Sequence, residues 1–185
     1  NETASITVSA LSGNTTEMGG TVTFTVVLDN QPTADVSIAV SSIDTSEATI
    51  SPSSLTFDSS NYSTLQTVTV TGVDDFYDDD NVSYTITVDP SSSITSYNTM
   101  TSSTVTGSNI DNDTAAITVG AKSGNTSEFG TTATINVTLA TIPTANVSMV
   151  VTDNDSSEVS ITPTTFTITP STWNTTCLLY TSPSP

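Results

Sequence analysis

The sequence predicts an all-β protein made of tandem antiparallel β-sandwiches, and three observations lead to this prediction. First, apolar and polar residues alternate along several short segments, which is the period of half-buried strands. Second, Thr, Ser and Val are abundant while Gly, Pro, Asn and Asp are scattered between the segments, a composition that favours strands and turns. Third, ASITVSALSG at residues 4–13 recurs as AAITVGAKSG at residues 115–124, so the chain contains two copies of one module.

The first copy contains seven segments with strand alternation. They lie within residues 6–8, 22–28, 36–40, 48–57, 68–70, 82–88 and 100–110. Pro52 interrupts the fourth segment, and a strand that contains proline is expected at the edge of a sheet. Seven short antiparallel strands in about a hundred residues are typical of an immunoglobulin-like β-sandwich.

The repeat sets the predicted domain boundaries. Its register, in which Ala115 matches Ala4, holds without gaps as far as residues 62–64 against 173–175. We therefore expect a complete sandwich at residues 1–113 and the N-terminal half of a second, truncated copy at residues 114–176. Residues 177–185 read CLLYTSPSP where the first copy has QTVTV, and this tail resembles the in-frame translation of a sequencing adapter. We expect it to be artefactual, which removes Cys177 from consideration.

An acidic run at residues 74–80 points to a bound cation. Asp74, Asp75, Asp78, Asp79 and Asp80 fall within seven positions, in a chain of net charge −18 with a single basic residue. Carboxylates this crowded repel one another, and the chain cannot supply the cation that would relieve the repulsion. All-oxygen ligation favours calcium over zinc or copper. The alternative is a solvated acidic loop of a halophilic or marine protein.

The predicted topology separates the acidic residues into two groups. Successive strands run up and down, so loops alternate between two poles. One pole receives Glu17, Asp44, Glu47, the run at 74–80, Asp111 and Asp113, while the other receives only Asp29, Asp35, Asp58 and Asp89. A protein that merely carries solvated charge would spread its acids over both poles, so this asymmetry favours calcium at the first.

Four motifs in order resemble the Calx-beta module. They are Glu17-x-Gly19-Gly20, SPSSLTF at residues 51–57, TVTVTGVDD at residues 67–75 and NIDND at residues 109–113. Calx-beta modules are repeated calcium-binding sandwiches of sodium/calcium exchangers and of large surface adhesins. The resemblance covers residues 3–113 fully and 114–176 in part.

The resemblance implies a set of calcium ligands. By position they are Glu17, Asp44, Asp74, Asp75, Asp79, Asp111 and Asp113, with Asn112 as a carbonyl donor. Two positions depart from the exchanger pattern: residues 79–81 read Asp-Asp-Asn where the exchangers carry glutamates, and Asn112 replaces a third aspartate. Both changes shorten or neutralise a ligand and bear on how many ions bind and how tightly.

The function expected from the sequence is that of a calcium-binding, calcium-rigidified extracellular repeat of a larger surface or adhesion protein. Its expected partners are Ca²⁺, neighbouring repeats and cell-surface ligands. The charge argues against nucleic acid and against anionic membrane. An enzyme is not expected, because the chain has no His and no triad. The alternatives are a carbohydrate- or protein-binding sandwich and a passive spacer without tight calcium sites; a calcium sensor within a membrane exchanger is a third.

Overall fold

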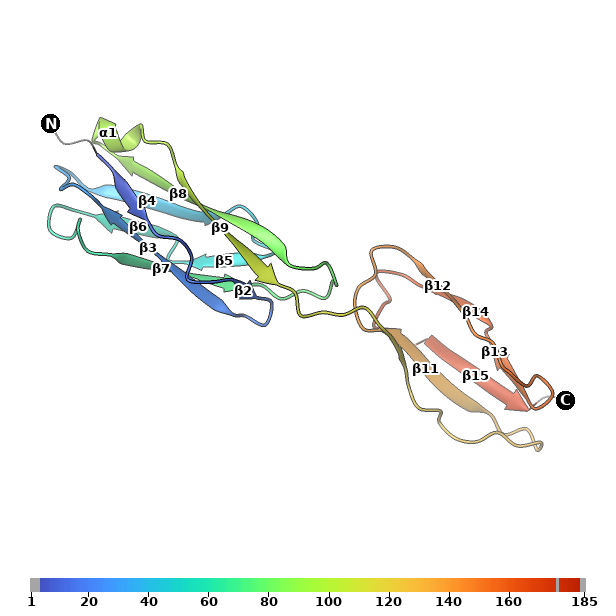
Figure 1. Ribbon diagram of the computed structural model, residues 1–185. Helices are drawn as coiled ribbons and strands as arrows, with labels where there is room; N and C mark the ends of the chain where they lie inside the picture. The colour runs from blue at the N-terminus through green and yellow to red at the C-terminus, as the bar shows by residue number, and fades with distance from the viewer. Residues whose placement is uncertain (1–3, 176, 184–185) are drawn as a thin grey trace. The chain divides into compact units, whose positions relative to one another are not determined.

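The regular secondary structure of the protein is almost entirely β-strand (Figure 1). The computed structural model describes residues 4–175 and 177–183. The chain forms two compact units, one of residues 1–75 and 79–112 and the other of residues 76–78 and 113–185. Nearly every strand pair is antiparallel, and the predicted all-β class is confirmed.

Unit 1 consists of two sheets. The first has the order β1-β3-β7-β5, and the second has the order β2-β9-β8-β4-β6. The strands of the first sheet are β1 (Ile6–Val8), β3 (Thr21–Leu28), β7 (Gln66–Gly72) and β5 (Ala48–Ser51). Those of the second are β2 (Thr15–Thr16), β9 (Ser103–Ile110), β8 (Val82–Ser92), β4 (Val36–Ser42) and β6 (Ser54–Phe57).

The core of unit 1 lies between these sheets, because each contributes every second side chain to one buried cluster. Phe24 and Val68 come from the first sheet, and Ile38 and Tyr84 from the second. All four side chains are at most 1% exposed. The apolar side chains of the alternation predicted from the sequence are therefore the ones that are buried between the two sheets.

The segment around Pro52 divides between the two sheets. The sequence predicted one interrupted strand at residues 48–57, but the structure has β5 before Pro52, paired with β7, and β6 after it, paired with β4. Each of these strands lies at the end of its sheet, as expected for a segment that contains proline.

Two short elements of unit 1 were not predicted from the sequence. Strand β2 pairs in parallel with the end of β9, through Thr15 with Asn109 and Thr16 with Ile110. Helix α1 (Thr95–Asn98) is a single turn that buries Tyr97. Within the described residues, no helix has the length and apolar character that crossing a membrane requires.

Unit 2 repeats part of this arrangement. Its strands are β10 (Ile117–Val119), β11 (Ala133–Leu139), β12 (Val147–Val150), β13 (Val159–Thr162), β14 (Thr165–Ile168) and β15 (Cys177–Pro183). They form a four-stranded sheet, β10-β11-β15-β13, and a two-stranded sheet, β12-β14. The order of the larger sheet matches β1-β3-β7-β5 strand for strand.

Strand β15 occupies the place of β7 in this correspondence. Ala133 pairs with Thr181 as Val22 pairs with Val70, which is the register of the sequence repeat. Leu179 and Thr181 are buried, and Tyr180 between them is exposed. The foreign origin proposed for residues 177–185 concerns the source of the sequence and stays a prediction; Ser184 and Pro185 lie outside the described residues.

Candidate metal site

Glu17 is held in place by backbone contacts at the end of the β2–β9 pair. Its backbone N–H donates to the carbonyl oxygen of Ile110 at 3.1 Å, and Gly19 turns the chain back with a φ of 78°. The backbone N–H and the side-chain Nδ2 of Asn112 donate to Glu17 Oε2 at 3.1 and 3.3 Å. The Glu17 side chain is only 2% exposed, which is unusual for a carboxylate without a basic partner.

Glu47 is a second buried carboxylate and lies between β4 and β5. The turn before it is closed by Asp44, whose Oδ1 accepts hydrogen bonds from the N–H and the hydroxyl of Ser46 at 3.1 and 2.5 Å. The backbone N–H of Val73 donates to the Glu47 carbonyl oxygen at 3.0 Å. Glu47 is 6% exposed.

Asn109 connects the segments that carry these two glutamates. Its Oδ1 accepts from the Thr15 hydroxyl at 2.9 Å, two residues before Glu17. Its Nδ2 donates to the Val73 carbonyl oxygen at 2.9 Å and reaches Glu47 Oε2 at 3.4 Å. Asn109 lies in β9 and is 1% exposed. Its hydrogen bonds therefore hold three separate parts of the chain together in the interior.

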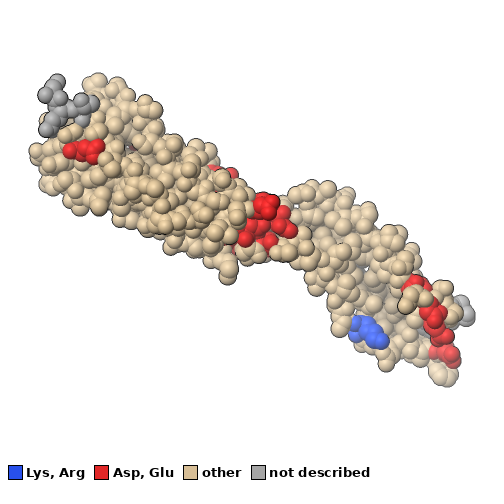
Figure 2. Space-filling model, in the orientation of Figure 1, with Lys and Arg blue, Asp and Glu red and all other residues tan. Residues whose placement is uncertain are grey.

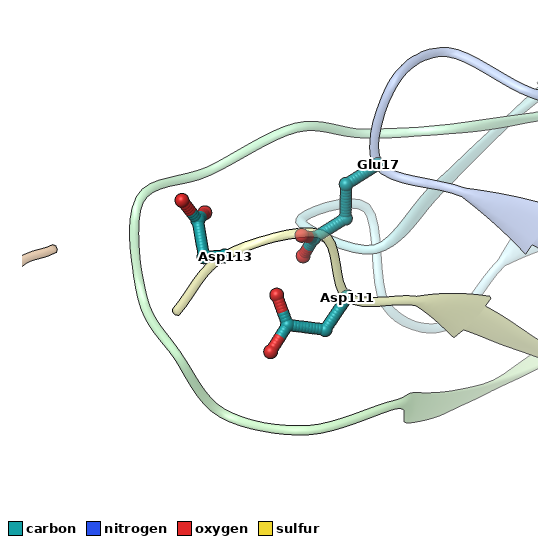
Figure 3. A group of neighbouring side chains, drawn as sticks. All are labelled: Glu17, Asp111 and Asp113. Atoms are coloured by element: carbon teal, nitrogen blue, oxygen red, sulfur yellow. The ribbon is translucent and has the colours of Figure 1, made fainter. Parts of the chain in front are cut away.

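Two groups of three carboxylates result from this arrangement. In each of them, one oxygen from every residue lies within 4.8 Å of the others. The first group is Glu17, Asp111 and Asp113, in which Glu17 reaches from the β2–β3 loop toward the segment that follows β9 (Figure 3). The second is Glu47, Asp75 and Asp79, which combines the β4–β5 loop with the β7–β8 loop.

Hydrogen bonds fix the β7–β8 loop against the segment after β9. The Asp80 backbone N–H donates to Asp111 Oδ2 at 3.1 Å, and Asn81 Oδ1 accepts from the Asp111 backbone N–H at 3.1 Å. Asp80 has a φ of 64°, a left-handed conformation that aspartate tolerates better than most residues. Figure 2 shows acidic side chains gathered at the end of unit 1 where these segments lie.

Three carboxyls of the two groups, those of Glu17, Glu47 and Asp79, have pKa values raised above their ordinary values. The pKa of the Glu17 carboxyl is raised to about 7, first by burial and then by the charges of Asp111 and Asp75, while the backbone hydrogen bond from Asn112 lowers it. Burial is also the main cause that raises the pKa of Glu47, and Asp79 and Asp44 add to it. The pKa of Asp79 is raised in the same way, first by burial and then by Asp75 and Asp111.

The donor atoms of both groups suit a hard divalent cation. All of them are carboxylate oxygens, which is the ligand chemistry of calcium. A divalent ion would also remove the repulsion that raises these pKa values. The two acidic groups could therefore bind metal ions, with Glu17 and Glu47 as the buried ligands.

Most of the residues predicted from the sequence lie in or beside the two groups. Asp74 contacts Asn112, whose Nδ2 donates to Asp74 Oδ1 at 3.3 Å. Asp44 lies in neither three-carboxylate group and instead closes the turn that positions Glu47. The predicted residues that fall within the groups are Glu17, Asp75, Asp79, Asp111 and Asp113.

Glu47 and Asn109 are the residues that the predicted ligand set omitted. The strand alternation places Glu47 at the same pole as the predicted ligands, although the predicted ligand set does not include it. A signal was available, since Asp44-Thr-Ser-Glu47 recurs as Asp155-Ser-Ser-Glu158 and Asp155 closes the same turn with Ser157. Asn109 opens the NIDND motif at residues 109–113, but nothing in that motif indicates that its side chain is buried and joins three segments.

The raised pKa of Glu17 predicts an unusual pH dependence in chelator. In the unfolded chain this carboxyl titrates near its ordinary value of 4.5, but in the folded protein it titrates near 7. Between these values the folded state binds the extra proton, so unfolding free energy should fall as pH rises through this window. Glu47 and Asp79 act in the same direction. Urea unfolding in EDTA at about pH 5 and pH 7.5 measures the effect, and E17Q should flatten it. An equal slope in E17Q would contradict the assignment.

Comparison with known proteins identifies no family. No family model matches the chain, and no curated protein matches it. Among solved structures, domains 5–6 of the S-layer protein SbsC align over 96% of this chain and 81% of theirs, with 17% identity and a TM-score of 0.38. A protein of unknown function from Porphyromonas gingivalis W83 aligns over 95% and 81%, with 13% identity and a TM-score of 0.37. Similarity at this level does not identify a function.

Proposed function

We propose that the protein is a calcium-binding structural module of the Calx-beta type, an immunoglobulin-like sandwich that occurs as an extracellular repeat of a larger surface or adhesion protein. The observation that carries the proposal is the pair of acidic groups around Glu17 and Glu47. Each combines a buried glutamate with two aspartates from another loop, although unit 1 contains no basic side chain. An arrangement of this kind costs stability unless a cation completes it.

The role of the ion in this proposal is structural. Its ligands come from the β2–β3 loop, the β4–β5 loop, the β7–β8 loop and the segment after β9. These four segments are distant in the sequence, so an ion held by them resists their separation, and its binding energy adds to the free energy of unfolding. Burial of both glutamates favours a calcium-binding module over a passive spacer, because the acidic loops of a passive spacer would be solvated.

Two of the proposed ligands lie on the short connection between the two units, so a bound ion would also affect this connection. Asp111 and Asp113 lie on residues 111–116, which join β9 to β10. Ligands within so short a connection would limit its backbone freedom, so calcium would stiffen the chain at this point. The proposed partners are therefore Ca²⁺ and neighbouring repeats of the same protein, and the proposed role is not enzymatic.

Calcium is expected to raise the melting temperature of the full chain substantially over its value in EDTA. At about a hundred times its dissociation constant, an ion that binds only the folded state adds about 2.7 kcal/mol, which corresponds to roughly 10 °C or more for a unit of this size. Differential scanning calorimetry with calcium, magnesium and EDTA measures the shift. The same melting temperature with calcium and with EDTA would refute the proposal.

The variants E17Q and E47Q separate a metal ligand from a merely structural residue. In EDTA each should melt above the wild-type protein because a buried repulsive charge is gone. With calcium each should melt below it because a ligand is lost. The control is D35N, since Asp35 lies at the opposite pole, where its carbonyl oxygen accepts a hydrogen bond from the Ser92 hydroxyl. A fall under both conditions would mean a packing role only. A glycan array with and without calcium would test the carbohydrate-binding alternative.

A further inference from the structure

Most of the asparagines stand in one short motif. Ten of the thirteen begin the sequence Asn-X-Ser/Thr, which is the acceptor motif for N-linked glycans. Ser and Thr fill fewer than four in ten positions of the chain, so their abundance alone would give about five such motifs. The motif at residues 14–16 recurs in the second copy at residues 125–127, in the register of the repeat. The motif is therefore more frequent than the composition explains.

Three of the four motifs that the structure describes in unit 1 begin with an asparagine whose side chain is already engaged. Asn61 Oδ1 accepts from the Asp58 backbone N–H at 2.7 Å, and Asn61 Nδ2 donates to the Thr56 carbonyl oxygen at 3.2 Å. Asn81 Oδ1 accepts from the Asp111 backbone N–H at 3.1 Å. A sugar on either side chain would crowd the turn or the loop that these hydrogen bonds hold.

Asn112 is the third engaged asparagine, and Asn14 begins the one motif of the four that is open. Asn112 Nδ2 donates to Glu17 Oε2 and to Asp74 Oδ1, both at 3.3 Å, so both N–H bonds of its amide are used. Asn14 is exposed, and its side chain makes no hydrogen bond with the described residues. The next residue, Thr15, is 0% exposed, so the alternation along the chain directs the Asn14 side chain away from the core.

Asn14 lies at one end of a groove between β1 and β9. The groove has a volume of about 670 Å³, with residues 6–11 on one side and residues 103–106 on the other. None of these residues is charged, and several of them carry hydroxyl groups. On the first side the groove ends at Leu11, three positions before Asn14, and on the β9 side it ends three residues before the pairing with β2.

The β9 side of the groove is an unpaired strand edge. The Ser108 carbonyl oxygen points toward β2, because it accepts from the Thr15 hydroxyl at 3.3 Å. Backbone groups of every second residue point to the same side of a strand, so those of Thr104 and Thr106 face the groove. Within the described residues, no strand pairs with them there, since β2 reaches only the end of β9. Natural proteins cover or charge such edges, and neither β1 nor β9 carries a charge.

We propose that Asn14 carries an N-linked glycan whose first sugars lie in this groove and cover the open edge of β9. The sugar hydroxyls supply donors and acceptors to the backbone groups of Thr104 and Thr106. The sugars are neutral, because acidic sugars would be repelled by a chain of net charge −18. The proposal rests on the proposed function only for the extracellular location, since N-linked glycans belong to exported proteins.

The attachment needs a sugar donor, which is an oligosaccharide held on a lipid pyrophosphate. Asn14 Nδ2 forms a bond to the anomeric carbon of the first sugar, and the bond from that carbon to the pyrophosphate oxygen breaks. The lipid pyrophosphate leaves, and the amide nitrogen loses one proton. The Thr16 hydroxyl completes the motif that a glycosyltransferase recognises.

Secretion of the full chain from a cultured eukaryotic host tests the attachment. Peptide mapping by mass spectrometry, before and after peptide N-glycosidase F, should find Asn14 glycosylated in most molecules, and Asn61 and Asn112 free of sugar. N14Q should lose this glycan. T16A should lose it as well, although Asn14 is untouched, and the matched variant T16S should keep it because serine also completes the motif.

Hydrogen exchange tests the position of the glycan. The backbone N–H groups of Thr104 and Thr106 should exchange several-fold more slowly in the glycosylated protein than in N14Q. The control is β5, which lies at the other edge of unit 1 and should exchange equally in both proteins.

Three results would overturn the proposal. The first is a secreted protein in which Asn14 carries no sugar. The second is equal occupancy at Asn14, Asn61 and Asn112, which would mean that the hydrogen bonds of the folded chain do not select the site. The third is equal exchange of Thr104 and Thr106 in the glycosylated protein and in N14Q, which would place the glycan in solvent and leave the groove empty. Because the attachment needs no calcium, each of these results leaves the calcium proposal untouched.

Discussion

Replacing Gly72 with alanine is expected to lower the unfolding free energy of unit 1 by about 2–4 kcal/mol. Gly72 ends β7 and is buried, and a Cβ at this position would overlap the carbonyl oxygen of Thr16 and the side-chain oxygen of Asn109. Neither can move easily, because Thr16 is paired with β9 and Asn109 holds three segments together. Urea unfolding of G72A in the presence and absence of calcium measures the loss.

The matched control for this substitution is G13A. A Cβ at Gly13 would meet only Val22 Cγ1 at 3.8 Å, an ordinary contact, so its effect should stay below about 1 kcal/mol. The clash at Gly72 also displaces Thr16, the residue before Glu17. G72A should therefore weaken calcium binding as well as stability. Equal effects of G72A and G13A would show that the β2–β9 pair can shift without cost.

Replacing Asn109 with leucine is expected to be comparably severe, at about 2–4 kcal/mol. Leucine has a similar volume, but it removes the donor to the Val73 carbonyl oxygen and leaves the buried Thr15 hydroxyl with only its longer contact, to the Ser108 carbonyl oxygen at 3.3 Å. It also removes the donor nearest to Glu47 Oε2, so the pKa of Glu47 should rise further. The measurement is urea unfolding of N109L, in EDTA and again with saturating calcium.

The variant N98L provides the control for N109L. Asn98 lies on α1 and is exposed, so the same change in chemistry should alter unfolding free energy by less than about 0.5 kcal/mol. If N109L unfolds like N98L, then the hydrogen bonds of Asn109 do not hold the site together. In that case the positions of Glu17 and Glu47 would have to be maintained by the strands alone.

The strand pattern could be predicted from the sequence because burial repeats at every second residue. Val68 and Val70, or Tyr84 and Ile86, are separated by single polar residues, and no helix period fits them. The convergence of acidic loops at one pole followed from the same alternation. The alternation alone places Glu17, the run at 74–80 and Asp111 at one end of the sandwich.

Other features depend on contacts that no local pattern records. Strand β2 has only two residues, and it exists because Thr15 and Thr16 meet the end of β9, far away in the sequence. Residues 48–57 divide into β5 and β6 because the first half pairs with β7 in one sheet and the second half pairs with β4 in the other. Glu47 is a candidate ligand because it is buried beside Asp75 and Asp79, and burial of a carboxylate is a property of the folded chain.

The parallel β2–β9 pair determines how unit 1 would respond to force. One strand lies near the beginning of the unit and the other is its last, and the two run side by side in the same direction. Tension applied through the two ends of the unit pulls these strands in opposite directions along their length. Their contacts are then loaded together, in shear, instead of being opened one after another. Glu17 and Asp111 directly follow the paired residues, so an ion bound there would sit where that load is carried.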